Sequence, residues 1–173
     1  MDALHTMNAN SDLPLIIVAC TGNICRSPMA EAVLRYYVEQ RGIAAQVSSC
    51  GLDAPVGRRP HEYAIQVNAD RGIPIDENKR SQACVSAELK RAAVIFVMEN
   101  HHRHQILHRY PAVGGKTFLL GHWQQGLQIP DPVKSPLPVF EQVYDYIDQG
   151  SQSWLEHLLK AGLVHPKEAS GSN

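Results

Sequence analysis

Residues 14–31 read PLIIVACTGNICRSPMAE, and this stretch decides the fold. Its opening run is apolar and rich in β-branched side chains, which is typical of a strand buried on both faces. Residues 20–27 then form a loop, where Ser27 and Pro28 provide a helix cap and a first-turn residue. Apolar residues follow at helical spacing as far as Val38. The stretch therefore predicts a strand, a loop and a helix in direct succession.

The rest of the chain continues this alternation. Further strands are predicted at residues 46–50, 93–98 and 117–120. Helices are predicted at residues 60–72, 99–109 and 140–158. We expect Gly150 to break or bend the last of these helices, because glycine is a poor helix former. Strands that alternate with helices indicate βαβ units and a parallel sheet covered on both sides.

Length and composition point to one folded domain. The chain has 173 residues, of which 44% are hydrophobic, as is ordinary for a globular protein. Its 16 basic and 17 acidic residues give a net charge of −1, so we expect neither nucleic-acid binding nor attachment to an anionic membrane surface. No apolar run approaches the roughly 20 residues that membrane insertion needs, and the N-terminus lacks a signal-peptide pattern. We therefore predict a cytoplasmic protein with a flexible N-terminal extension (1–13), a folded domain (14–162) and a polar C-terminal tail (163–173).

The loop at residues 20–27 has the features of a site for a tetrahedral dianion. It leads into a helix N-terminus, where backbone N–H groups and the helix dipole favour negative charge. Arg26 adds a planar fork that can hold two oxygens of a phosphate. Gly22 and Asn23 suit the unusual backbone conformations of a tight loop. The ATP-binding pattern GxxxxGK[ST] is absent, so a phosphate group, and not ATP, is the expected ligand.

Cys20 stands at the start of this loop. A thiol beside a helix N-terminus and an arginine ionises readily to the thiolate, and the Ser27 hydroxyl can donate a hydrogen bond to it. A thiolate that faces the phosphorus of a phosphate ester is a nucleophile, and its attack gives a phosphocysteine intermediate. The leaving group then needs a proton, for which we predict Asp131, placed between two prolines, as general acid and later as base. We expect this chemistry to need no metal and no cofactor.

For the cysteines outside the loop and for the histidines we predict structural roles and no chemistry. Without a secretory signal, four cysteines suggest thiol chemistry or packing before a disulfide framework. We therefore predict that Cys50 and Cys84 are buried or incidental. His101, His104 and His108 lie at i, i+3 and i+7, so they could share a metal-binding helix face, but we interpret them as a solvated polar face.

Residues 20–31, CTGNICRSPMAE, resemble the signature of the low-molecular-weight protein tyrosine phosphatases. The sequence IPDP at 129–132 is similar to the acid loop of that family, and SSCGL at 48–52 occurs in the expected order. KTFLLGHW at 116–123 is similar to the bacterial branch of the family that is linked to exopolysaccharide export. The resemblance extends over roughly residues 14–160.

The resemblance implies a fold, an activity and a set of roles. The implied fold is α/β, a single-domain three-layer sandwich with a central four-stranded parallel sheet flanked by helices. The implied activity is hydrolysis of phosphotyrosine, with Cys20 as nucleophile, Arg26 as phosphate ligand and Asp131 as acid and base. The implied phosphate-binding loop consists of Thr21, Gly22, Asn23, Ile24, Cys25, Arg26 and Ser27.

Support, redox and partner roles are also implied by the resemblance. Asn23, Ser27 and Ser49 would form the hydrogen-bond network that supports the loop. Cys25 would be a backup thiol that traps an oxidised Cys20 as a disulfide. The implied partner is a phosphotyrosine protein, an autophosphorylated bacterial tyrosine kinase of exopolysaccharide export, and we expect the chain to act as a monomer.

The sequence departs from the family pattern at several positions. Val133 follows the acid loop where the family commonly has an aromatic wall for the phosphotyrosine ring. Glu77 and Arg80 lie in the stretch where a histidine commonly joins the loop network, and Cys50 replaces a small residue. We expect the first departure to alter substrate affinity and ring selectivity and to leave the chemistry intact.

Three alternative functions use a similar loop. Arsenate reductases need two further resolving cysteines after the third strand, whereas Met98 ends that strand and Cys84 lies alone before it. Arginine phosphatases have threonine at the position of Ile24. A non-catalytic phosphotyrosine-binding module usually lacks the cysteine or the acid, and this chain has both Cys20 and Asp131.

Overall fold

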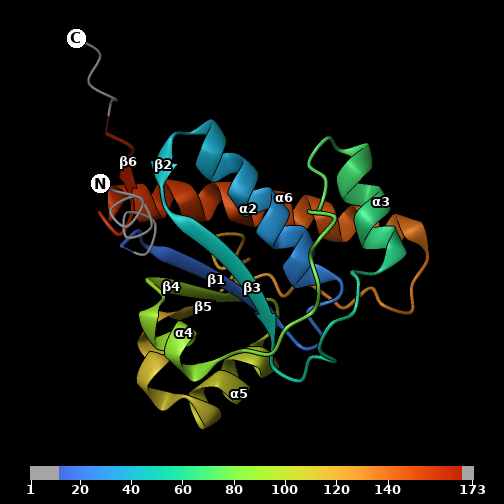
Figure 1. The fold of residues 1–173 in the computed structure, drawn as a ribbon, viewed down its shortest axis with the longest axis horizontal. Helices are drawn as coiled ribbons and strands as arrows, with labels where there is room; N and C mark the ends of the chain where they lie inside the picture. The colour runs from blue at the N-terminus through green and yellow to red at the C-terminus, as the bar shows by residue number, and fades with distance from the viewer. Residues whose placement is uncertain (1–11, 169–173) are drawn as a thin grey trace, which may run out of the picture.

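The structure, a computed structural model, describes residues 12–168. Its centre is a four-stranded sheet in the order β3-β1-β4-β5, in which every neighbouring pair of strands is parallel (Figure 1). The strands are β1 (Leu15–Cys20), β3 (Gln46–Gly51), β4 (Val94–Val97) and β5 (Thr117–Leu119). All four therefore end at the same edge of the sheet.

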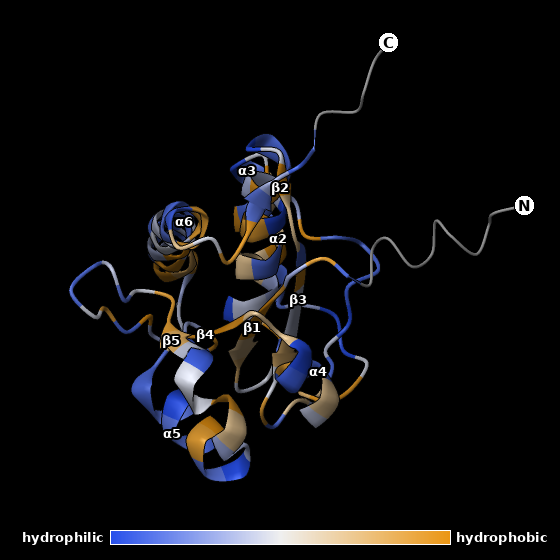
Figure 2. Cartoon of the chain, turned by 90° about the vertical axis from the view of Figure 1, so that its left-hand side faces the viewer, coloured by the Kyte–Doolittle hydropathy of each residue, from blue (hydrophilic) through white to orange (hydrophobic). Residues whose placement is uncertain are grey.

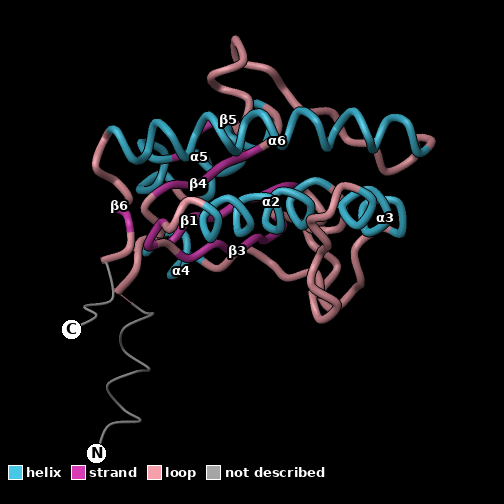
Figure 3. Tube along the Cα trace, turned by 90° about the horizontal axis from the view of Figure 1, so that it is seen from above, coloured by secondary structure: helices cyan, strands magenta, loops and turns pink. Residues whose placement is uncertain are grey.

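Helices cover both faces of this sheet (Figure 2). On one face lie α2 (Arg26–Gln40), α3 (Glu62–Asp70) and α6 (Leu137–Lys160). On the other face lie α4 (Ser86–Arg91), α5 (Asn100–Arg109) and the short 3-10 helix η1 (Pro111–Lys116). Seen from above, α6 runs beside α2 (Figure 3). The predicted three-layer α/β fold with a four-stranded parallel sheet is confirmed.

Strand β1 is buried along its whole length, which explains its apolar sequence. Successive side chains of a strand point to opposite faces. Ile16, Val18 and Cys20 accordingly belong to the core under α2, whereas Ile17 and Ala19 belong to the core on the α4 and α5 side. The last residue of β1, Cys20, therefore lies at the carboxyl edge of the sheet on the α2 side.

The start of α2 differs from the prediction. The helix begins at Arg26, with Cys25 in the cap position and no side-chain cap. Ser27 is thus not the cap residue. Its hydroxyl oxygen lies 2.9 Å from the sulfur of Cys20, because the loop turns this side chain inward.

Helix α6 continues through Gly150, so the predicted break of the helix does not occur there. A Cβ atom at Gly150 would lie 2.6 Å from the backbone carbonyl oxygen of Leu120. Glycine at this position allows the helix to pack directly against the chain that follows β5. Close packing, and not helix termination, accounts for this residue.

A second, two-stranded antiparallel sheet joins β2 (Ile43–Ala44) to β6 (His165–Pro166). The backbone N–H of Lys167 also donates to the carbonyl oxygen of Gly42 at 2.7 Å, and Val164 is buried. The first part of the segment predicted as a polar tail is therefore packed against the chain after α2. Residues 1–11 of the predicted N-terminal extension and residues 169–173 of the predicted tail lie outside the described residues.

Cys50 and Cys84, which were predicted to be buried or incidental, form a disulfide, so they are not incidental; Cys50 is buried as predicted and Cys84 is partly exposed. Their Cα atoms lie 4.9 Å apart, although 34 residues separate them in the sequence. They meet because the chain before α4 pairs with the end of β3, through a parallel bridge between Gly51 and Ala83. No helix within residues 12–168 is both long and apolar enough to cross a lipid bilayer.

Candidate active site

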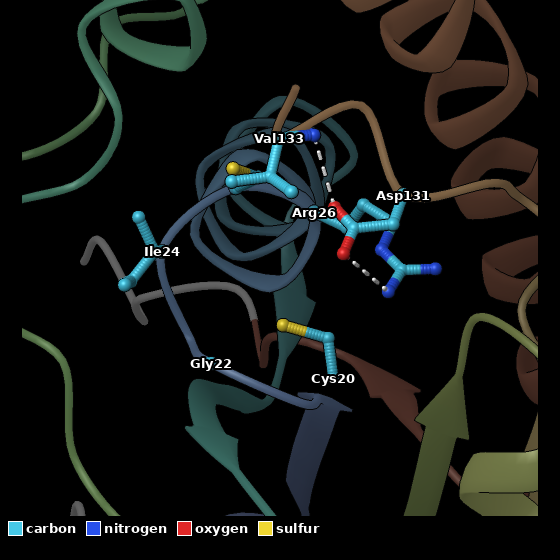
Figure 4. A pocket seen from close by; sticks show the side chains of 7 residues that line it. Cys20, Gly22, Ile24, Arg26, Asp131 and Val133 are labelled. Carbon is cyan, nitrogen blue, oxygen red and sulfur yellow. Dashed lines mark hydrogen bonds and ion pairs between the residues drawn. The ribbon is translucent and has the colours of Figure 1, made fainter. Parts of the chain in front are cut away.

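A small pocket opens at the carboxyl end of β1, where parallel α/β sheets commonly bind ligands. Its volume is about 80 Å³, and the loop at 20–27 meets the acid loop there (Figure 4). The lining residues are Cys20, Gly22, Ile24, Cys25, Arg26, Asp131 and Val133. The fold thus brings together two segments that are far apart in the sequence.

Asn23 fixes the shape of the loop. Its backbone φ of 54° is left-handed, which asparagine tolerates better than most residues, and its side chain is buried. Its Nδ2 donates to Ser27 Oγ at 2.8 Å and to Ser49 Oγ at 2.9 Å. Its Oδ1 accepts a hydrogen bond from the backbone N–H of Gln82 at 3.0 Å. The three residues predicted to support the loop are therefore in contact, and Gln82 joins them.

The sulfur of Cys20 has two hydrogen-bond partners. Ser27 Oγ lies 2.9 Å away, and the backbone N–H of Asn23 donates to the sulfur at 3.3 Å. Because the Ser27 oxygen already accepts a bond from Asn23 Nδ2, its own proton is available to point at the sulfur. Two donors thus converge on Cys20, an arrangement that suits a thiolate.

Cys25 differs from Cys20 although it lines the same pocket. Burial, together with the nearby charges of Asp131 and Cys20, raises the pKa of Cys25 to about 12 despite the opposing charge of Arg26. At neutral pH Cys25 is therefore a protonated thiol and a poor nucleophile. Both cysteines are free, and the backup redox role of Cys25 stays a prediction.

Arg26 is almost fully buried. Its Nη1 donates to the Glu99 carboxylate and to the backbone carbonyl of Ile129, the latter at 2.7 Å. Its Nη2 lies 3.9 Å from Asp131 Oδ2 (Figure 4). A buried guanidinium is stable only with such partners. Glu99 and Ile129 hold Nη1 of the guanidinium, and Nη2 lies on the side of Asp131 and the pocket.

His102 supports the loop from α5. Its Nδ1 accepts a hydrogen bond from the backbone N–H of Glu99 at 3.1 Å, so in the neutral ring Nε2 carries the proton and donates to Thr21 Oγ1 at 3.0 Å. Burial, helped by the charges of Arg26 and His101, lowers the pKa of His102 to about 3. The imidazole is therefore neutral in this structure over the whole physiological range.

Asp131 is one of the exposed residues that line the pocket. Its side chain is 47% exposed, and its Oδ1 accepts a hydrogen bond from the backbone N–H of Val133 at 3.1 Å. The carboxylate therefore faces both the solvent and the pocket. A group in this position can reach the leaving oxygen of a bound phosphate ester and also a water molecule.

Four residues of this site were missed in the sequence: Gln82, Glu99, His102 and Ile129. Glu99 follows the predicted strand at 93–98 directly, so its place at the carboxyl edge of the sheet was a usable signal. Gln82 acts on the loop through its backbone N–H, which any residue other than proline supplies, and Ile129 acts through its backbone carbonyl, which every residue supplies. The identity of the residues at these two positions therefore gave no signal of their roles.

The three histidines of the possible metal face, His101, His104 and His108, are all exposed on α5. Across residues 12–168, no cluster of three or more histidine, cysteine, aspartate or glutamate side chains could hold a metal ion. The neighbouring His102, which the sequence pattern did not single out, is the histidine that contacts the site.

Comparison with known proteins places this geometry in a family. Residues 15–163 match the model for "Low molecular weight phosphotyrosine protein phosphatase". The probable phosphatase EpsP of Ralstonia nicotianae is 36% identical over 147 residues, which cover 85% of this chain and 97% of that protein. Wzb of Escherichia coli K12 is 35% identical over 145 residues, which cover 83% of this chain and 94% of that protein.

Solved structures agree with these matches. The crystal structure of the tyrosine phosphatase AmsI from Erwinia amylovora superposes with a TM-score of 0.79 at 33% identity, over 85% of this chain and 94% of that one. An arginine phosphatase from Geobacillus stearothermophilus superposes with a TM-score of 0.77 at 30% identity, over 87% of this chain and 96% of that one.

The chain belongs to the low-molecular-weight phosphotyrosine protein phosphatase family. It is a protein-tyrosine-phosphatase of the type represented by EpsP, AmsI and Wzb, with 35–37% identity to those three proteins.

Proposed function

We propose that this phosphatase cleaves phosphotyrosine through a phosphocysteine on Cys20, and that it acts on an autophosphorylated bacterial tyrosine kinase. The observation that carries the mechanism is the pocket itself. It combines a sulfur with two hydrogen-bond donors, a fixed arginine and an exposed carboxyl group. Each of these groups has one step to perform.

Binding comes first. The N-terminus of α2 and the backbone of residues 20–27 offer N–H groups to the phosphate oxygens. Since Nη1 of Arg26 is held by Glu99 and Ile129, Nη2 is left for the substrate. The arginine thus enters the reaction already oriented, which lowers the reorganisation that the transition state requires.

Transfer to the enzyme follows. The Cys20 thiolate attacks the phosphorus, a sulfur–phosphorus bond forms, and the bond from phosphorus to the tyrosine oxygen breaks. Asp131 gives its proton to the departing phenolate, so that tyrosine leaves as a neutral phenol. Cys25, a protonated thiol, does not compete for the phosphoryl group.

Hydrolysis completes the cycle. Asp131, now ionised, takes a proton from a water molecule that attacks the phosphocysteine, and inorganic phosphate is released. The sulfur departs as a thiolate, which Ser27 and the N–H of Asn23 are placed to stabilise. The enzyme returns to its starting state with Asp131 protonated.

Two aliphatic side chains line the pocket on either side of this chemistry. Ile24 comes from the phosphate loop and Val133 from the acid loop (Figure 4). The aromatic ring of a bound phosphotyrosine would have these two apolar side chains to pack against, whereas a phosphoserine or phosphothreonine side chain has no ring to place there. This supports tyrosine as the phosphorylated residue.

The proposed substrate rests on relatives and not on the pocket. The chain resembles the bacterial branch linked to exopolysaccharide export, and EpsP, AmsI and Wzb are among its relatives. An autophosphorylated tyrosine kinase of that export system is the substrate we propose.

The test compares purified enzyme on four substrates in the presence of EDTA: a phosphotyrosine peptide, a phosphoserine peptide, a phosphoarginine peptide and an autophosphorylated export kinase. We expect turnover of the first and the last, and rapid acid quenching of Asp131→Ala should trap a phosphoryl group on Cys20. Faster release from phosphoarginine would overturn the substrate assignment. Turnover without any label on Cys20 would overturn the mechanism.

A further inference from the structure

We propose that Cys50 and Cys84 form a second, reversible redox site, whose disulfide clamps together the two segments that hold the phosphate loop in its active shape. The inference rests on the proposed function of that loop. It assigns a regulatory role to the pair that is separate from any reaction between Cys20 and Cys25.

The disulfide lies next to the residues that hold Asn23. Ser49, which accepts from Asn23 Nδ2, directly precedes Cys50, and Gln82, whose N–H donates to Asn23 Oδ1, lies two residues before Cys84. The Gln82 side chain also donates to the carbonyl oxygen of Ser49 at 2.8 Å. The disulfide therefore links covalently the two segments that Asn23 contacts.

The backbone around the disulfide leads directly to the catalytic loop. Gly51 donates to the carbonyl oxygen of Gln82 at 2.8 Å, and its own carbonyl accepts from Cys84 at 3.0 Å. The next residue, Leu52, donates to the carbonyl oxygen of Cys20 at 2.9 Å. A Cβ atom on Gly51 would lie 2.7 Å from the carbonyl oxygen of Thr21. A shift of this segment must therefore move the loop.

The sheet separates the two pairs of cysteines. Cys20 and Cys25 belong to the core under α2, whereas Cys50 and Cys84 belong to the core on the opposite face. Direct exchange between Cys20 and the disulfide is therefore blocked by β1 and β3. The coupling that we infer runs through Asn23 and the backbone.

Small thiols can reach the disulfide. A pocket of about 260 Å³ lies on the α4 side of the sheet and is lined by Cys50, with Gln82, Ala83 and the exposed Val85 among its other walls. Cys84 itself is partly exposed. This opening is separate from the one that leads to Cys20.

The chemistry is thiol–disulfide exchange with a small-molecule disulfide. One cysteine thiolate attacks a sulfur of that molecule and releases one small thiol, giving a mixed disulfide. The second cysteine attacks the mixed disulfide, forms the Cys50–Cys84 bond and releases the second small thiol. The protein thiols lose two electrons and two protons, and the small disulfide gains both. A reducing small thiol reverses the sequence.

The experiment uses the full chain with oxidised glutathione as the oxidant and inorganic phosphate present to cover the catalytic loop. Alkylation and peptide mapping count the Cys50–Cys84 disulfide and the free Cys20 thiol. Activity on a phosphotyrosine peptide, per free Cys20, is then compared before and after full reduction with a phosphine. Cys50→Ser/Cys84→Ser is carried through the same treatments as the matched control. Hydrogen exchange of residues 20–27 is the readout that does not depend on turnover.

We expect kcat to fall by about threefold to tenfold when the disulfide is reduced, as for the loss of one or two supporting hydrogen bonds. Exchange at residues 20–27 should become faster, and the double variant should behave like the reduced wild type in both redox conditions. The reduced wild type carries no substitution. A loss of activity that it shares with the double variant therefore cannot be due to a folding defect caused by the substitutions.

Two results would overturn the inference. One is equal kcat and equal exchange in the oxidised and reduced wild type. The other is mapping that finds Cys50 and Cys84 as free thiols after treatment with oxidised glutathione. If every form fails to turn over phosphotyrosine, the proposed function fails, and the exchange data still decide whether the disulfide clamps the loop.

Discussion

The phosphate loop at residues 20–27 and the acid loop at residues 130–135 face each other across one pocket, but they are anchored differently. The phosphate loop is mostly buried and forms hydrogen bonds with β3, with the segment before α4 and with α5. In the acid loop, Asp131 and Val133 are 47% and 44% exposed. Its hydrogen bonds at Asp131 and Ser135 join neighbouring residues.

This difference matches the two tasks. Stabilising a developing dianion requires donors that are fixed before the reaction, because reorganising them costs activation energy. Proton transfer requires a group that can reach first the leaving oxygen and then a water molecule. The prolines on both sides of Asp131 stiffen the acid loop, but the solvent around its carboxylate leaves it room to adjust.

The largest loss of activity is expected when the nucleophile of the phosphate loop is removed. Cys20→Ser is expected to lower kcat by more than about 10⁴-fold, since a serine hydroxyl is a far weaker nucleophile than a thiolate and lacks a neighbouring base. The phosphate loop should remain intact, so titration calorimetry should still detect inorganic phosphate binding. Residual turnover within tenfold of the wild type would contradict the assignment of the nucleophile.

Removing the acid should have a smaller effect that depends on the leaving group. Asp131→Ala is expected to lower kcat on a phosphotyrosine peptide by about 10²- to 10³-fold and on p-nitrophenyl phosphate by less, because nitrophenolate leaves without a proton. Asp145→Ala changes an exposed aspartate of α6 that pairs with Arg71 and does not line the pocket, and it is the matched control. Equal losses on both substrates would show that Asp131 is not the acid.

A third change tests whether the phosphate loop depends on its anchors. Glu99→Gln keeps the shape of the side chain but removes the charge that holds Arg26, and we expect kcat/KM to fall by about tenfold. The exposed Glu156 of α6 provides the control variant Glu156→Gln. If Glu99→Gln retained full kcat/KM, the arginine would be held well enough by the Ile129 carbonyl alone.

The last change leaves catalysis aside and concerns stability and its dependence on pH. The pKa of His102 is about 3 in the folded chain, against an ordinary value of 6.5. Between pH 6.5 and pH 3, His102 is therefore protonated in the unfolded chain but neutral in the folded chain. The stability that neutral His102 contributes is therefore complete above pH 6.5 and declines as the pH falls toward 3, by at most about 1.4 kcal/mol for each pH unit.

His102→Gln should remove this part of the decline, and urea unfolding at pH 6.5 and pH 4.5 measures it. His108→Gln, which changes an exposed histidine of the same helix, should keep the wild-type decline. Parallel curves for wild type and His102→Gln would mean that another group carries the acid sensitivity.

The features that could be predicted from the sequence are those that depend on residues close together in the chain. The strand, loop and helix at 14–31 are encoded by neighbouring residues, and the same short stretch brings Cys20 and Arg26 to one pocket. The parts it missed depend on contacts between distant segments. Cys50 meets Cys84 only after β3 pairs with the chain before α4, and Gln82 supports Asn23 through its backbone N–H. The role of Gly150 depends on how closely α6 packs against Leu120.

The pairing of β2 with β6 also decides how this enzyme can be handled. Described residues at both ends of the chain, those before β1 and those after β6, lie at the amino edge of the sheet, because β6 pairs with the residues just before β3 (Figure 1). The catalytic pocket opens at the opposite edge. An affinity tag or an immobilising linker attached directly at residue 12 or at residue 168 would therefore lie away from the pocket, and a resin-bound form could be offered a phosphoprotein from solution.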